Sequence, residues 1–139
     1  MMKNVVLTGC VAAVTGLALQ LATAADPDIG NLHPAAKKDG LTFDKDIKPL
    51  LEKSCLKCHG AEKPKSEYRV DSREAFIKGG ESDEAAVIPG KSEKSHVVLY
   101  SSDLVADMEM PPTDKRDKYP KMTPEQIGIL RAWIDQGAK

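Results

Sequence analysis

Aromatic residues are scarce in this chain, which limits the core that its own side chains can build. The 139 residues include two Phe, three Tyr and one Trp, a lean set for a free-standing domain. The net charge of −1 gives no basic excess of the kind that nucleic acid attracts. No alternation typical of strands and no internal repeat is evident. These absences favour a small all-α domain that does not bind nucleic acid.

Long apolar runs are also lacking, apart from one at the N-terminus. Lys3 precedes an apolar run from Val5 to Ala22, and Ala22-Thr23-Ala24 supplies the small residues of a cleavage site. We therefore predict a signal peptide at residues 1–24, an exported (periplasmic) protein and no membrane span after cleavage. The alternative, an uncut anchor, stays open because the run is close to spanning length. A lipoprotein site at Cys10 is disfavoured because the apolar segment before it is short and continues past it.

Cysteine is rare too, with three residues in all, and two of them belong to one short motif. Cys55 and Cys58 stand three apart, and His59 follows at once. This is the attachment pattern of a c-type haem, in which each thiol adds to one porphyrin vinyl group and the histidine becomes the proximal iron ligand. The sequence therefore predicts one covalent haem c. A buried porphyrin would also supply the apolar bulk that the aromatics do not.

Three other interpretations of the cysteine pair remain. A thioredoxin-like redox pair belongs at a helix start in a βαβ unit, whereas a helical pattern precedes Cys55. Structural zinc needs four ligands, and only His33 and His96 remain, in no paired spacing. A plain disulfide is the third. Each is weaker than haem.

Helical patterns with loops between them run along the rest of the chain. We expect a loose leader at residues 25–41 and a cytochrome-sized domain at residues 42–139. Within the domain, a kinked first helix and a well-capped last helix are the clearest elements. The expected helices are Thr42 to about Ser54 with Pro49 inside, a short one that begins at an Asp71–Glu74 capping box and stops at Gly79, one from Ser92 to about Tyr100, and one capped by Thr123 and Gln126 that ends at Gly137.

The sixth iron ligand is predicted to be Met110. A thioether favours reduced iron and suits an electron carrier, and the two prolines after Met110 stiffen the loop that must hold the sulfur. Met108 is the competitor two residues earlier, while Met122 is more remote. His96 is a further candidate, although an exposed helical histidine is the commoner case.

The order of these motifs resembles the planctomycete-type cytochrome c domain, a member of the class I cytochrome c superfamily. The resemblance extends from Phe43 to Ala138. It implies a small helical fold whose first and last helices cross over the haem, with Cys55 and Cys58 attaching the haem and His59 and Met110 as its axial ligands. The motifs that carry it are Cys-x-x-Cys-His-Gly, Val70 to Ala75, Lys78 to Ser82, Ile88-Pro89-Gly90-Lys91, Met110-Pro111-Pro112 and Leu130 to Ala138.

The function predicted from these residues is single-electron transfer between redox protein partners by a monomeric, non-enzymatic carrier. One rival is a haem protein with an open sixth position that binds or reduces a small molecule. A metal-only or haem-sensing module is another. The charges suggest electrostatic steering of a partner, because lysines gather near the haem motif and acidic residues in the stretch 81–112. The lysines are Lys53, Lys57, Lys63 and Lys65.

Overall fold

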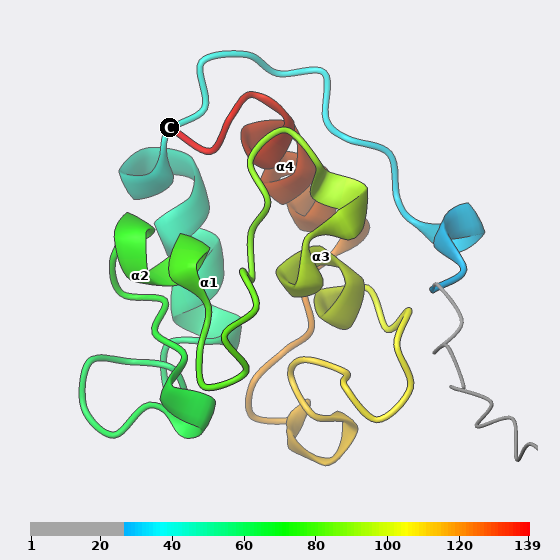
Figure 1. The fold of residues 1–139 in the computed structure, drawn as a ribbon. Coiled ribbons are helices and arrows are strands. Elements are labelled where there is room, and N and C mark those ends of the chain that lie inside the picture. The colour runs from blue at the N-terminus through cyan, green and yellow to red at the C-terminus, as the bar shows by residue number, and fades with distance from the viewer. Residues whose placement is uncertain (1–26) are drawn as a thin grey trace, which may run out of the picture.

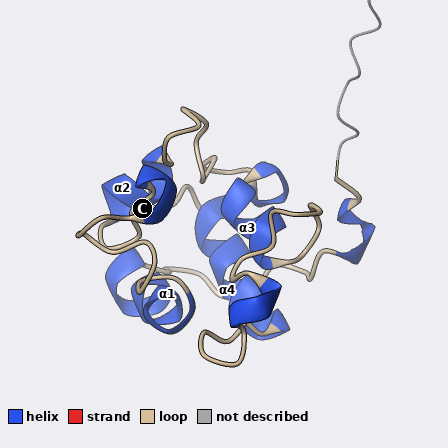
Figure 2. Cartoon of the chain, turned by 90° about the horizontal axis from the view of Figure 1, so that it is seen from below, coloured by secondary structure: helices blue, strands red, loops and turns tan. Residues whose placement is uncertain are grey.

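The computed structural model describes residues 27–139, and within them the chain forms short helices joined by long loops, with no strand. Figures 1 and 2 show α1 and α2 on one side of the molecule and α3 and α4 on the other. The prediction of a small all-α domain is confirmed. The predicted signal peptide, its cleavage site and Cys10 lie outside the described residues. Among residues 27–139, no helix has both the length and the apolarity that a membrane span requires.

The last helix, α4 (Pro124–Asp135), begins and ends as its sequence predicts. The Thr123 hydroxyl accepts from the Gln126 amide, and the Gln126 side chain accepts from the Thr123 amide. At the other end, Gly137 has a φ of +94°. The Ala138 amide donates to the Trp133 carbonyl at 3.0 Å, which closes the helix by a Schellman motif.

The first helical segment differs from the predicted single kinked helix. A π-helical turn at Phe43–Ile47 leads into α1 (Lys48–Ser54), so that Pro49 lies in the first turn of α1 and removes no internal hydrogen bond. Thr42 precedes the π-helical turn, but its hydroxyl caps nothing. Instead, the Asp46 carboxylate accepts from the Thr42 amide at 2.9 Å.

The two middle helices are shorter than their patterns suggest. The predicted Asp71 cap of α2 (Arg73–Lys78) is wrong by one residue, because Ser72 accepts from the Ala75 amide while Asp71 pairs with Arg69. The predicted stop at Gly79 is confirmed. The pattern from Ser92 divides into a 3₁₀ turn and α3 (His96–Ser101) at Ser95.

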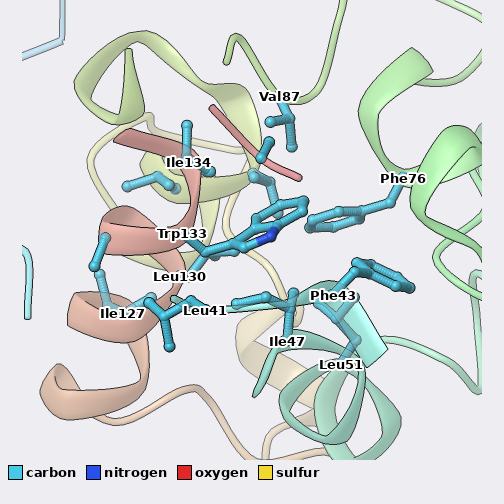
Figure 3. Packing of buried hydrophobic residues seen from close by; sticks show 14 of the residues in the cluster. Leu41, Phe43, Ile47, Leu51, Phe76, Val87, Ile127, Leu130, Trp133 and Ile134 are labelled. Carbon is cyan, nitrogen blue, oxygen red and sulfur yellow. The ribbon is translucent and has the colours of Figure 1, made fainter. Parts of the chain in front are cut away.

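The core joins α4 to the first helical segment and to α2 through aromatic side chains. Figure 3 shows Trp133 pointing toward Phe43 and Phe76, and all three are almost fully buried. The ring centroid of Trp133 lies 5.9 Å from that of Phe43 and 6.1 Å from that of Phe76, within the separation at which aromatic rings attract each other. Met122 is buried in the same cluster. Met122 is therefore core filler, as is common for methionine.

The leader makes defined contacts with α4. The Ala36 amide donates to the Gly128 carbonyl at 2.9 Å, and the Gln136 side chain donates to the Lys38 carbonyl at 2.7 Å. A Cβ on Gly128 would lie 2.9 Å from the Pro34 carbonyl oxygen, so only glycine lets the leader approach α4 this closely. The leader's boundaries at residues 25–41 stay a prediction, but residues 34–38 are attached to the domain.

Candidate haem site

The Cys-x-x-Cys-His motif forms a helix-like turn directly after α1. The Cys55 amide still donates to the Leu51 carbonyl at 2.8 Å, and the His59 amide donates to the Cys55 carbonyl at 3.0 Å. Cys55 and Cys58 are both free thiols. The turn therefore presents two thiols and an imidazole within five residues, the spacing that haem attachment requires.

His59 is oriented by a backbone carbonyl. Its Nδ1 lies 3.1 Å from the Tyr68 carbonyl oxygen, which can only accept, so Nδ1 carries the proton and Nε2 keeps its lone pair for a metal. Burial lowers the pKa of His59 and outweighs its backbone hydrogen bonds. The imidazole is thus held neutral, in the form that ligates iron.

Tyr68 connects this histidine to the core. Its ring packs edge-on against His59 with centroids 5.3 Å apart, and it stacks on Phe76 at 6.2 Å. The Tyr68 hydroxyl donates to the Phe76 carbonyl at 3.1 Å. Sequence reasoning missed Tyr68, because its role depends on a backbone carbonyl and no residue type signals that.

A cavity of about 330 Å³ lies over the motif, a size typical of sites for organic ligands. Its lining is mostly apolar and includes Cys55 and His59 from the motif and Met110 from the distant loop. The structure thus brings three of the four predicted site residues around one cavity. The fourth, Cys58, follows Cys55 by one turn and is not part of the lining.

The competing distal ligands divide into those near the cavity and those far from it. Met108 and His96 also line it, while Met122 and His33 do not. Met108 is 41% exposed. The His96 ring stacks on Tyr100 at 5.2 Å, and its Nδ1 lies 3.5 Å from the Glu84 carboxylate. His96 therefore has other partners, and Met110 is less exposed than Met108, but the choice among the three stays a prediction.

Two adjacent glycines shape one wall of the cavity. A Cβ on Gly79 would lie 2.1 Å from the Glu84 carbonyl oxygen, and one on Gly80 would lie 2.2 Å from the Ser66 carbonyl oxygen. Gly79 also has a φ of +95°. From the sequence, these two glycines are predicted only to end a helix. In the structure they also let neighbouring loops approach each other closely beside the cavity.

The donor set fits a haem. The Cys55 thiol, a neutral imidazole and a thioether border an apolar cavity, and the Cys58 thiol lies one turn away in the same motif. These are the groups that attach and ligate a c-type haem. Zinc fits poorly, because the described part of the chain has no group of three or more His, Cys, Asp or Glu residues that could hold a metal. The burial that raises the pKa of the Cys55 thiol to about 12 also disfavours a thioredoxin-like thiolate.

The fold and the site thus define the class of c-type cytochromes. Residues 55–114 match the model of the family described as planctomycete cytochrome C. The predicted resemblance to this family is confirmed over these residues, which make up less than half of the chain.

The other comparisons add little. No curated protein matches the chain. Among solved structures, Kuenenia stuttgartiensis hydrazine synthase is similar, with 21% identity and a TM-score of 0.46. The alignment covers 70% of this chain but 16% of that one, so this chain spans a small part of that protein's length.

Proposed function

We propose that the protein is an exported mono-haem cytochrome c that carries single electrons between redox protein partners. The observation that carries the proposal is that Cys55, His59 and Met110, which are up to 55 residues apart in sequence, line one apolar cavity. Bound haem would supply a one-electron iron couple, reduced by a donor protein and reoxidised by an acceptor protein. The export rests on the predicted signal peptide and stays a proposal.

The chain's own residues have three tasks in this function. Cys55 and Cys58 would hold the porphyrin edge. The hydrogen bond from His59 Nδ1 to the Tyr68 carbonyl leaves Nε2 available to ligate iron. Met110 would supply a soft distal ligand that raises the potential. The mostly apolar lining would limit the contact of a bound haem with water, which further favours the less charged, reduced state.

The test is an optical spectrum of the haem-loaded protein in both oxidation states, with Met110→Ala and Met108→Ala as a matched pair. The weak red absorption band of a methionine–ferric iron bond should be present in the wild type and in Met108→Ala. It should be lost in Met110→Ala, whose reduction potential should fall because the soft ligand is gone. A band that disappears only in Met108→Ala would assign the distal ligand to Met108 instead.

A haem protein with an open sixth position is the rival function. It predicts a high-spin wild-type spectrum that Met110→Ala does not change.

The electrostatic steering inferred from the charge order also stays a prediction. Glu81 and Glu84 line the cavity, so its mouth carries part of the acidic stretch. Electron transfer with a basic partner should therefore slow as ionic strength rises.

A further inference from the structure

The loop that carries Met110 is fixed at both sides of the methionine. The Met110 amide donates to the Tyr100 carbonyl in α3 at 3.0 Å. The next residue, Pro111, is buried, and its carbonyl accepts from the Arg116 Nε at 3.0 Å. The methionine is therefore held between a helix and a guanidinium.

Arg116 is itself anchored to the end of α3. Its two terminal nitrogens lie 3.0 and 2.6 Å from the two carboxylate oxygens of Asp103, a bidentate pair. Asp103 stands two residues after α3 with a φ of +58°. All three nitrogens of the guanidinium thus have partners, and they tie the Pro111 carbonyl to the same helix end that binds the Met110 amide.

Lys121 provides a comparison within the same network. Its ammonium lies 2.6 Å from the Asp103 carboxylate, so it shares the acidic partner of Arg116. The structure gives it no hydrogen bond to the Met110 loop. Lys121 and Arg116 therefore place like charges on the same carboxylate, but only Arg116 reaches the loop.

We propose that Arg116 is a positioning residue for Met110, with Asp103 as its anchor. This inference rests on the proposed function, in which Met110 is the distal iron ligand. A planar guanidinium can bind a carboxylate with two nitrogens and a carbonyl with the third, whereas a lysine ammonium has no such fixed geometry. The charged stretch after Pro112 thus holds the distal loop in place.

The test measures how firmly the distal ligand is held in the haem-loaded protein. Imidazole added to the oxidised protein competes with the Met110 sulfur for iron, so a looser loop shows as tighter imidazole binding. Loss of a hydrogen bond to a charged group corresponds to about a tenfold change in an equilibrium constant. We therefore expect Arg116→Ala to lower the apparent imidazole Kd about tenfold, with a weaker red methionine–iron band.

Lys121→Ala is the matched control, because it removes one positive charge from the same carboxylate. Its imidazole Kd should stay within about twofold of the wild type, since each lost surface pair contributes little by itself. Arg116→Lys retains the charge but not the planar geometry. We expect it to reverse less than half of the change in log Kd for imidazole that Arg116→Ala causes. This variant also tests the geometry if Arg116→Ala does not fold.

Two results would overturn the inference, and they can be told apart. Equal imidazole affinities in the wild type, Arg116→Ala and Arg116→Lys, with the band lost only in Met110→Ala, would show that Met110 ligates iron without help from Arg116. Equal affinities in the wild type and Met110→Ala would show that Met110 is not a ligand. In that case the proposed function fails as well.

Discussion

His59 and Met110 line the same cavity, but contacts of very different kinds hold them. On the proximal side, the His59 ring and backbone bond to Tyr68 and Val70, which lie nine and eleven positions along the chain. On the distal side, Met110 and its neighbour depend on α3 and on Arg116, whose own anchor is 13 residues away. The proximal side is held by backbone hydrogen bonds and aromatic packing, and the distal side by a guanidinium–carboxylate pair between side chains.

This difference shows which part of the site can change without loss of the haem. The attachment motif is a continuous turn that follows α1, and the stack from Tyr68 through Phe76 to Trp133 joins it to the core. The distal loop, by contrast, is fixed by hydrogen bonds and ion pairs that are partly exposed to solvent. Mutations on the proximal side should therefore affect haem attachment, and those on the distal side should change the ligation and the reduction potential of the iron.

The largest effect is expected at the two thiols. Replacing both Cys55 and Cys58 by Ala should abolish covalent attachment, because no other cysteine lies within residues 27–139. Intact-mass spectrometry of the exported protein, and haem staining after denaturing electrophoresis, would measure this. Met110→Ala is the distal counterpart and should retain a full haem mass. Covalent haem in the double variant would disprove the attachment site.

The same division explains what the sequence could predict. The Cys-x-x-Cys-His turn and the caps of α4 are contiguous patterns, in which the His59 amide bonds to Cys55 and the Thr123 and Gln126 side chains and amides bond to each other. The cap of α2 was misplaced because Asp71 and Ser72 are both good capping residues, and the pairing of Asp71 with Arg69 decides between them.

The distal contacts could not be predicted because their partners are side chains and carbonyls on separate loops. Arg116 is the single arginine among several charges in the stretch from 113 to 121, but nothing in the sequence indicates that its partners are Asp103 and the Pro111 carbonyl. Likewise, the sequence marks Gly128 only as a residue that weakens a helix. The structure shows that the leader packs against it. Both depend on tertiary approach, which no local pattern encodes.

An intermediate effect is expected at Gly79, in the wall between the two sides. Gly79→Ala forces a side chain into a positive φ and within 2.1 Å of the Glu84 carbonyl oxygen, so a loop must move. We expect a loss of about 3 kcal/mol in the free energy of unfolding, from backbone strain plus steric overlap. Chemical denaturation of the haem-loaded protein would measure it.

Gly90→Ala is the matched control for this prediction. Gly90 has a similar φ of +80°, but no atom lies within 4 Å of the position that a Cβ would occupy. Its replacement should therefore cost only the strain, about 1 kcal/mol. Equal losses in the two variants would mean that the close approach at Gly79 contributes nothing and that the loops beside the cavity adapt freely.

The smallest effect is expected from the pH dependence of the distal network. Burial alone would raise the pKa of Asp103, but hydrogen bonds from Arg116 and Lys121 outweigh it and lower the pKa. A carboxyl whose pKa is lower in the folded state stabilises the fold above its unfolded pKa of about 3.9 and loses this contribution as the pH falls through the folded value. Because the pair is partly exposed, we expect about 0.5–1 kcal/mol at pH 7.

Asp103→Asn should therefore be less stable than the wild type at pH 7, and the two should converge in acid as Asp103 becomes protonated. Denaturation of both proteins between pH 7 and pH 3 measures the difference. Asp114→Asn is the control, because its carboxylate pairs with Lys115 in full solvent and should give no measurable change. A gap between wild type and Asp103→Asn that persists unchanged into acid would show that the amide disturbs packing and that the charge of Asp103 stabilises nothing.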